Sequence, residues 1–321
     1  MKKTMFLQAI NETLFEEMRR DERVFVMGED VELSPMGGTA GLVDEFGKER
    51  VRNTPLSELA IIGAAAGAAA MGMRPVVDMM MASFFYCGID QLINNVAKLR
   101  YMSGGQMRLP VVFRATTGCL GSAAAQHSSS PHAIMMHTPG IKVIMPSNAY
   151  DVKGLLRAAI RDDDPVIFFE HGQLGATMSE IPDEDYTLPI GKAEVKREGT
   201  DVTIVANALM LVKSLAAAET LQNDGISAEV VDLRTLVPLD KETILKSLEK
   251  TGRMVVVDEG HMTCGLTGEI AGIAAEEGFD FLKAPVKRIA MPDVPIGFSP
   301  VLENHVVPDE ENIIQAVKDI I

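Results

Sequence analysis

The sequence predicts an α/β protein made of two doubly wound domains, and three observations support this fold class. The chain has 321 residues, which exceeds what a single hydrophobic core usually covers. Segments with helical and with strand-like apolar spacing alternate, as in parallel sheets covered by helices on both faces. Residues 181–199 interrupt this alternation, because they are rich in Pro, Asp, Glu and Gly without a helical period. We therefore expect domains at residues 1–180 and 200–321, joined by a linker at 181–199.

The first domain opens with an amphipathic helix at residues 4–20, in which Phe6, Ile10, Leu14 and Met18 recur every four positions. Thr54-Pro55 indicates the start of a second helix, because proline is favoured at the first helical position. The other expected elements are strands at 24–27, 110–114, 142–145 and 166–169, an apolar segment at 76–81, and helices at 89–101 and 149–161.

The second domain repeats the alternation on a smaller scale. The expected elements are strands at 202–206, 228–233 and 254–258, helices at 209–221, 241–248 and 265–276, and a closing amphipathic segment at 310–321. No internal repeat is visible, so each domain is expected to have its own core.

Composition and charge exclude several functions. The formal net charge of −15 argues against nucleic acid as a partner, because phosphate binding needs clustered Lys and Arg. The longest apolar run, residues 60–73, is too short to span a bilayer. We expect no signal segment, because Gln8, Asn11 and Glu12 interrupt the apolar core that one would need. Cys87, Cys119 and Cys264 form no disulfide framework or metal-binding pair. We therefore expect a cytoplasmic protein without a membrane segment.

Glu58 is the first candidate for chemistry, within Asn53-Thr-Pro-Leu-Ser-Glu58. A carboxylate in the first turn of a helix can simply complement the positive end of the helix dipole. Alternatively, the flanking Leu56, Ala60 and Ile61 create apolar surroundings in which a carboxyl group holds and shares a proton. The spacing by itself leaves both interpretations open.

Two further segments carry polar groups. Gly121-Ser-Ala-Ala-Ala-Gln-His127 presents an imidazole on a loop of small residues, either as a general acid or base or as an ordinary surface histidine. Asp162-Asp-Asp164 lies at an expected helix C-terminus, where negative charge is disfavoured. It is either a solvated charge run compensated by arginines or part of a cation site. There is no GxGxxG, no GxxxxGK[ST] and no transition-metal spacing.

Taken together, these segments resemble the beta subunit of the decarboxylating component of pyruvate, branched-chain 2-oxo acid and acetoin dehydrogenase complexes, over nearly the whole chain. The segments that carry the resemblance are Met27-Gly-Glu-Asp30, Thr54-Pro-Leu-Ser-Glu58, Gly72-Met-Arg-Pro75, Asp90-Gln91, Arg100-Tyr-Met-Ser-Gly-Gly105, Gln126-His127-Ser128, Pro139-Gly-Ile-Lys-Val143, Lys153-Gly-Leu-Leu156, Ala159-Ile-Arg-Asp162 and Val257-Asp-Glu259. The resemblance implies a thiamin pyrimidine-binding domain followed by a transketolase C-terminal-like domain.

The resemblance also implies roles for particular residues. Glu58 matches the glutamate that hydrogen-bonds the aminopyrimidine ring of thiamin diphosphate, and Leu56 and Phe84 match residues that lie against this cofactor. His127 matches the active-site histidine, and His137 matches a further family position. A structural potassium site would use Asp162 and Asp164 with carbonyls of Val111, Ala159 and Ile160, although many relatives have Asn where Asp164 stands.

The partners implied are an alpha subunit, in an alpha-2-beta-2 heterotetramer, and a lipoyl acyltransferase component. The alpha chain of this family holds magnesium and the diphosphate through a GDG motif, which this sequence lacks. The expected reaction cleaves acetoin or a 2-oxo acid and passes the acyl unit to lipoamide, which makes the chain part of an oxidoreductase. Cys87 and Ser129 depart from the usual pyruvate pattern and leave the substrate open. The alternatives are a split transketolase subunit and a noncatalytic α/β binding subunit.

Overall fold

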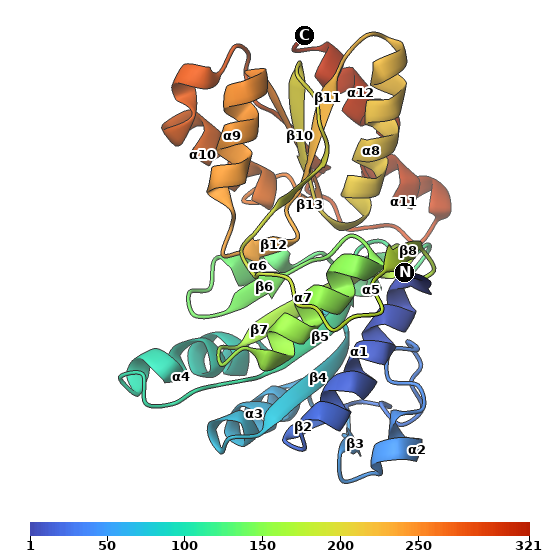
Figure 1. The fold of residues 1–321 in the computed structure, drawn as a ribbon, viewed down its shortest axis with the longest axis vertical. Helices are drawn as coiled ribbons and strands as arrows, with labels where there is room; N and C mark the ends of the chain where they lie inside the picture. Colours follow the sequence, from blue (N-terminus) through green and yellow to red (C-terminus); the bar gives the residue numbers. More distant parts are fainter. The chain divides into compact units, whose positions relative to one another are not determined.

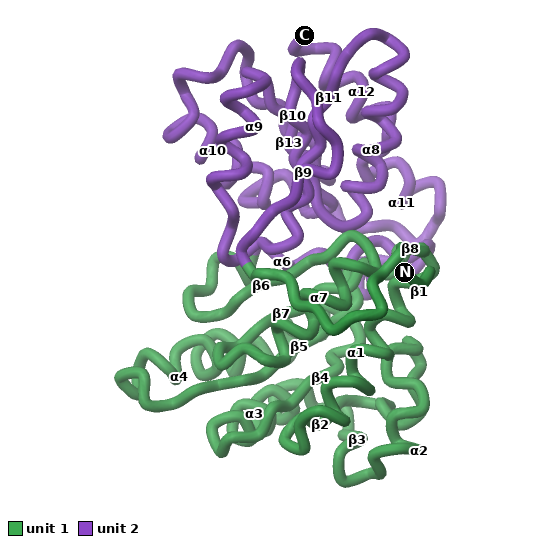
Figure 2. Tube along the Cα trace, viewed as in Figure 1, with its two compact units in different colours: residues 1–117, 134–190 green, residues 118–133, 191–321 purple.

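The computed structural model describes all residues from 1 to 321, and the chain divides into two compact units. Unit 1 comprises Met1–Thr117 and Ile134–Ile190, whereas unit 2 comprises Gly118–Ala133 and Gly191–Ile321 (Figure 2). The short segment Gly118–Ala133 therefore belongs to unit 2, although its neighbours on both sides in the chain belong to unit 1. No helix combines the length and the apolar character needed to cross a membrane.

Six strands of unit 1 form a parallel sheet in the order β6-β7-β5-β4-β2-β3. Their bounds are β2 Val24–Gly28, β3 Val51–Asn53, β4 Arg74–Met81, β5 Val112–Thr117, β6 Lys142–Ile144 and β7 Val166–His171. The central strands β2, β5 and β7 are buried along their whole length. This burial on both faces explains why β2 and the first four residues of β7 are continuous apolar runs rather than alternating ones.

Helices flank this sheet, and α1 Phe6–Arg20 packs beside α7 Ala149–Arg161 (Figure 1). The remaining elements of unit 1 and the segment next to it are β1 Lys2–Met5, α2 Leu42–Phe46, α3 Glu58–Ala70, η1 Ala82–Gly88, η2 Gln91–Val96, α4 Ala97–Met102, α6 His132–Met136, η3 Gly172–Leu174 and β8 Met178–Ile181. Charge pairs fix the α1 and α7 contact, since Lys153 and Arg161 donate to Glu16 and Glu17.

Unit 2 has a five-stranded sheet in the order β14-β13-β10-β11-β9, in which only β9 is antiparallel to its neighbour. Helices α8 and α12 cover one face and α9 and α10 the other (Figure 1). The bounds are α5 Ala124–His127, β9 Glu194–Arg197, β10 Val202–Ala206, α8 Ala208–Asn223, β11 Ala228–Asp232, β12 Thr235–Val237, α9 Lys241–Thr251, β13 Met254–His261, α10 Leu266–Glu277, η4 Phe279–Phe281, β14 Lys287–Met291, α11 Pro300–Val306 and α12 Glu310–Lys318.

Most predicted elements are present, and the differences are local. The expected helix at 89–101 is divided into a π-helix, η2, and a short α-helix, α4, and a 3₁₀ segment, η1, precedes them. Gly88 lies so close to α3 that a Cβ atom there would be 2.5 Å from Ile62 Cδ1 and 3.0 Å from the Glu58 carbonyl oxygen. This close approach depends on packing that apolar periodicity does not show. The expected linker also contains a strand, β9, which pairs with β11.

Candidate functional site

Leu56, Glu58 and Phe84 line one hollow on unit 1, together with Glu29, Ile61, Asp78, Met79 and Met80. The hollow encloses about 240 Å³, part of which is open to solvent. The structure therefore brings together the three residues that the sequence resemblance assigned to a cofactor ring. Leu56 is 72% exposed, so its side chain is available to a ligand.

The hollow forms where two neighbouring parallel strands end. Strand β2 ends at Gly28 and leads directly to Glu29, and β4 carries Asp78, Met79 and Met80 near its carboxyl end. Ligands of α/β sheets commonly bind at this edge. Gly28 makes the two strands' close approach feasible, because a Cβ atom there would lie 2.3 Å from the Asp78 carbonyl oxygen.

Glu58 is the first residue of α3, with Ser57 at the N-cap position. The sequence had predicted a helix start at Pro55, and this start is wrong by three residues. The shift matters, because Leu56 then lies outside the helix and contributes to the rim of the hollow. The Glu58 carboxylate meanwhile lies at the positive end of the helix dipole, which favours a negative charge there.

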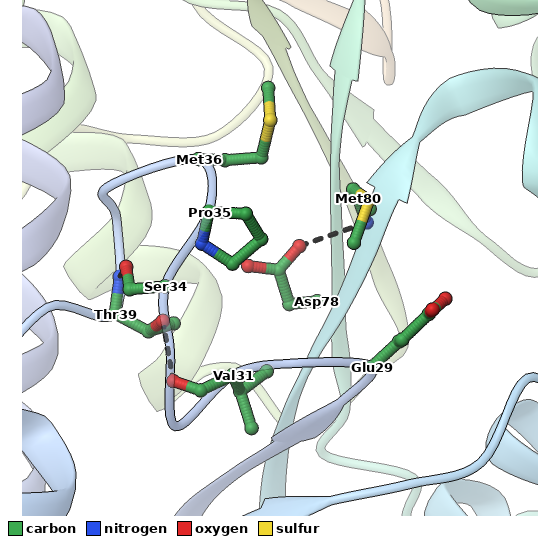
Figure 3. Close-up of a pocket in the computed structure, with 8 residues that line it drawn as sticks. All are labelled: Glu29, Val31, Ser34, Pro35, Met36, Thr39, Asp78 and Met80. Carbon is green, nitrogen blue, oxygen red and sulfur yellow. Dashed lines mark hydrogen bonds between the residues drawn. The ribbon is translucent and has the colours of Figure 1, made fainter.

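A second hollow of about 200 Å³ adjoins the first and shares Glu29, Asp78 and Met80 with it (Figure 3). Its other lining residues are Val31, Ser34, Pro35, Met36 and Thr39. The Asp78 carboxylate accepts the backbone N–H of Met80 at 2.9 Å and holds Met80 at a φ of 59°, in the left-handed region (Figure 3). Such a conformation persists in a non-glycine residue only where the surroundings fix it.

Negative charges surround the shared wall of the two hollows. Burial raises the pKa of the Glu29 carboxyl group, and the nearby charges of Asp30 and Glu58 raise it further. The Arg114 guanidinium donates to Asp78 at 2.7 Å and to both oxygens of Glu170 at 2.8 Å. Sequence reasoning did not assign a role to these residues. Glu170 directly follows the predicted strand 166–169, and Glu29 follows the predicted strand 24–27 after Gly28, so each had a weak local signal as an acid at a strand end.

Charge neutralisation governs the buried part of this network. Burial by itself would lower the pKa of Arg114, but the Glu170 and Asp78 carboxylates outweigh it and keep the guanidinium charged. Burial raises the pKa of Glu170 even though Arg114 opposes the shift. Arg114 therefore fixes Asp78, which in turn shapes the wall that both hollows share.

His127 belongs to unit 2, whereas the residues that line the two hollows belong to unit 1. It is the last residue of the short helix α5, within the Gly118–Ala133 segment of unit 2, and its side chain is exposed. His137 is also exposed and follows α6 directly. The roles of His127 and His137 stay predictions.

The oxygens expected to hold potassium all accept hydrogen bonds from the protein. Arg74 donates to the Ile160 carbonyl at 3.0 Å, and Lys142 donates to Asp162 at 2.6 Å. The remaining contacts are those of Asp164 with Lys142 and Arg100, of the Ala159 carbonyl with the Asp162 N–H, and of the Val111 carbonyl with the Val166 N–H. No three His, Cys, Asp or Glu side chains are grouped to bind a metal. Lys142, Arg74 and Arg100 contact oxygens that the cation would use, and the potassium site stays a prediction.

The fold is that of a transketolase-like protein, with a hollow at the carboxyl edge of its first sheet. Residues 2–177 match the family described as "Transketolase, pyrimidine binding domain", and residues 191–313 match "Transketolase, C-terminal domain". A solved structure described as "Split gene transketolase, inactive beta4 tetramer" superposes with a TM-score of 0.80 at 26% identity. The superposition covers 97% of this chain and 96% of that one.

Curated relatives define the family more narrowly. The chain is 44% identical to the acetoin:2,6-dichlorophenolindophenol oxidoreductase subunit beta of Bacillus subtilis, over 98% of this chain and 96% of the relative. It is 46% identical to the 2-oxoisovalerate dehydrogenase subunit beta of Bacillus subtilis, over 98% of both chains. It is 44% identical to the pyruvate dehydrogenase E1 component subunit beta of Rickettsia felis, over 98% of this chain and 97% of the relative. The chain belongs to this family of dehydrogenase beta subunits.

Proposed function

We propose that this chain is the beta subunit of a thiamin-diphosphate-dependent dehydrogenase that cleaves acetoin or a 2-oxo acid such as pyruvate. The observation that carries the proposal is the grouping of Leu56, Glu58 and Phe84 around one hollow. By their names, relatives at 44% to 46% identity act on acetoin, 2-oxoisovalerate or pyruvate. These nearly equal identities support the reaction class and leave the substrate to be measured.

The residues of the hollow fit an aminopyrimidine ring. Leu56, Ile61 and Phe84 offer apolar surface to its faces, and the Glu58 carboxylate offers a hydrogen-bond acceptor at its edge. When bound, thiamin diphosphate supplies an electron sink for breaking a carbon–carbon bond next to a carbonyl group. Glu58 holds a proton at a ring nitrogen, while Leu56 and Phe84 orient the ring and keep water from it.

His127 handles protons when the acyl unit passes to its acceptor, for which we propose the disulfide of a lipoyl group on an acyltransferase component. An imidazole suits this task because one ring nitrogen can donate a proton while the other accepts one. The same proposal places magnesium and the diphosphate mainly on an alpha subunit, in an alpha-2-beta-2 heterotetramer. The word "beta" in the relatives' names supports such a partner.

The test is to purify the chain with an alpha subunit and to measure thiamin-dependent dye reduction with acetoin, pyruvate and branched-chain 2-oxo acids in parallel. Glu58→Gln should lower kcat/KM about 100-fold or more, because an amide cannot exchange the proton. Glu219→Gln on the exposed face of α8 is the matched control and should change nothing. Equal activity of Glu58→Gln and the control would contradict the role of Glu58.

A split transketolase subunit is the second candidate, and its support is the superposition at a TM-score of 0.80 on a solved structure that is only 26% identical. In that case the two-carbon fragment would pass to an aldose phosphate rather than to lipoamide. The same preparation distinguishes the two reactions, since one reduces dye or lipoamide and the other produces a longer sugar phosphate. A noncatalytic binding subunit would show neither activity.

A further inference from the structure

We propose that Glu303, on helix α11 of unit 2, is a positioning residue for His127. This inference rests on the proposed function, because it concerns the histidine assigned there to proton handling. His127 lies in the segment Gly118–Ala133, here called the histidine loop, which belongs to unit 2. Three buried carboxylates of unit 2 bind this loop, and Glu303 binds it nearest to α5.

The Glu303 carboxylate accepts two consecutive backbone N–H groups, from Gly121 at 3.0 Å and from Ser122 at 2.9 Å. Each N–H has its own oxygen, Oε1 for Gly121 and Oε2 for Ser122. Glu303 is only 3% exposed, so water does not weaken this pair of bonds. A hydrogen bond to an ionised acceptor is stronger than one between neutral groups, and a carboxylate is the side chain that accepts two at once.

The backbone between these bonds and His127 needs such support. Ser122 has a φ of 64° and Ala124 a φ of 60°, in the left-handed region that non-glycine residues rarely adopt. Helix α5 begins at Ala124 and ends at His127. The direction in which α5 leaves the loop is therefore set by two strained residues, and Glu303 holds one of them directly.

The other two carboxylates bind the ends of the histidine loop. The Cys119 N–H donates to Glu259 at 2.6 Å, and the His132 ring contacts Asp258 at 2.8 Å with both side chains buried. Asp258 also accepts from Asn207 at 3.1 Å. Within the loop, the Gly118 N–H donates to the Ser129 carbonyl at 3.4 Å and draws the two ends together. With both ends fixed, Glu303 binds the backbone directly before α5.

The consequence is a division of roles within unit 2. Glu303 touches no reacting group in this proposal and acts only through the backbone of Gly121 and Ser122. Its loss should therefore lower the fraction of molecules in which His127 is correctly placed. That change reduces kcat and leaves the binding of substrate in the ground state unchanged.

The first experiment uses hydrogen exchange on the full chain. Glu303→Gln keeps the side-chain size but has one acceptor oxygen instead of two, so the Gly121 and Ser122 amides should exchange at least tenfold faster. Glu219→Gln is the matched control and should leave their exchange unchanged. Glu303→Asp, which keeps both acceptor oxygens, should recover part of the protection. Unchanged exchange in Glu303→Gln would overturn the proposal.

The second experiment measures kinetics in the assembled enzyme. Glu303→Gln should lower kcat about tenfold with KM unchanged, and it should have no further effect when His127→Ala is already present. Equal fold-losses in the presence and absence of His127 would overturn the positioning role. If Glu303→Gln does not fold, Glu303→Asp replaces it in the same cycle with His127→Ala, with the same criterion.

A third readout is independent of activity. The ring signals of ¹³C-labelled His127 should shift or broaden in Glu303→Gln and stay unchanged in Glu219→Gln. If the unmodified enzyme shows no turnover, the proposed function has failed, while this signal and the amide exchange still decide whether Glu303 positions His127. A His127 signal identical in all three proteins would overturn the proposal.

Discussion

Arg114 is the residue on which the buried charges of unit 1 depend. Its side chain is 2% exposed, and it pairs with Asp78 and Glu170 from the neighbouring strands β4 and β7. Gly38 lies against the Arg114 guanidinium. A Cβ atom at this position would be only 2.5 Å from Nη2, so a larger residue would displace the side chain. Removing one partner of a buried ion pair leaves the other charge without compensation, which costs more than the pair itself contributed.

We therefore expect Arg114→Leu to lower the free energy of unfolding by about 3–5 kcal/mol, because the buried Glu170 carboxylate and the partly buried Asp78 carboxylate lose their cation. Urea denaturation followed by circular dichroism measures the change. Arg108→Leu is the matched control, since Arg108 is 70% exposed in its pair with Asp163 and should contribute at most about 1 kcal/mol. Equal losses of unfolding free energy in the two variants would show that the buried ion pairs of Arg114 contribute no more to stability than an exposed pair does.

His132 gives the stability of unit 2 a dependence on pH. Burial by itself would lower the pKa of His132, but the charges of Asp258 and Glu259 outweigh it and raise the pKa above its ordinary value. Burial likewise opposes the ionisation of Asp258, and His132, Asn207 and the Gly260 N–H lower its pKa nevertheless. The His132 Nδ1 atom has no hydrogen-bond partner, so the ring's contact with an acid runs from Nε2 to Asp258, and Glu259 adds its charge.

The sign of the effect follows from the direction of the shift. A raised histidine pKa stabilises the folded state fully below the unfolded value of about 6.5, and the stabilisation is lost as the pH rises through the folded value. We expect the unfolding free energy of the unmodified chain to fall by about 1.4 kcal/mol per pH unit in that window. His132→Gln should remove this slope. Urea titrations of both proteins between pH 6 and pH 9 measure it. A slope that persists in His132→Gln would mean that another group is responsible.

At the scale of elements, the helix N-termini show which local sequence signals are sufficient to predict a capping hydrogen bond. Asn148 caps α7, since its side chain accepts the Asp151 N–H at 3.0 Å, and Asp309 begins α12 with a reciprocal capping box. Ser299 has the N-cap position of α11 without any side-chain cap hydrogen bond. A favourable residue type at a helix start is therefore an incomplete predictor, because the side chain must also point back to the helix.

We expect Asn148→Ala to lower the free energy of unfolding by about 1 kcal/mol, because the Asp151 N–H loses its acceptor. Ser299→Ala is the control at an N-cap position without a bond, and its effect should stay within about 0.5 kcal/mol. Chemical denaturation of both variants measures the difference. An equal loss in Ser299→Ala would mean that residue type alone, not the capping bond, determines the effect.

At the scale of the whole molecule, a cut between the two family domains does not isolate unit 2. Cys119 is fully buried in the apolar core of unit 2, although the residues around it in that core all follow position 200. Asp258, Glu259 and Glu303 also bind the histidine loop. A fragment of residues 191–321 therefore lacks part of its core and the loop groups that contact Asp258, Glu259 and Glu303.

We expect the fragment 191–321 to melt about 10 °C lower when the histidine loop is absent than when it is supplied, since each kcal/mol changes the Tm of a domain this size by about 4 °C. Adding a synthetic peptide of residues 118–133 should raise the Tm in a concentration-dependent way. A peptide of the same composition in scrambled order is the control. An identical Tm with and without the peptide would show that the loop contributes nothing to unit 2.

The sequence by itself determined the features that local interactions specify. Apolar periodicity and turn residues located most helices and strands, because the period of the apolar residues follows from the local backbone geometry of each element. The resemblance assigned Leu56, Glu58 and Phe84 to one ligand, and the structure groups them around a single hollow. The charge and the absent phosphate motifs restricted the classes of function.

Only the tertiary structure decided which distant residues meet. Glu303 contacts Gly121 across 182 positions, Glu259 contacts Cys119 across 140, and Asp258 contacts His132 across 126. Asp78, Arg114 and Glu170 likewise come from three separate strands. No periodicity or spacing records such pairs, because each side chain is locally an ordinary acid or base. They are selected by the packing of whole elements, which leaves a buried charge stable only where its partner is also present.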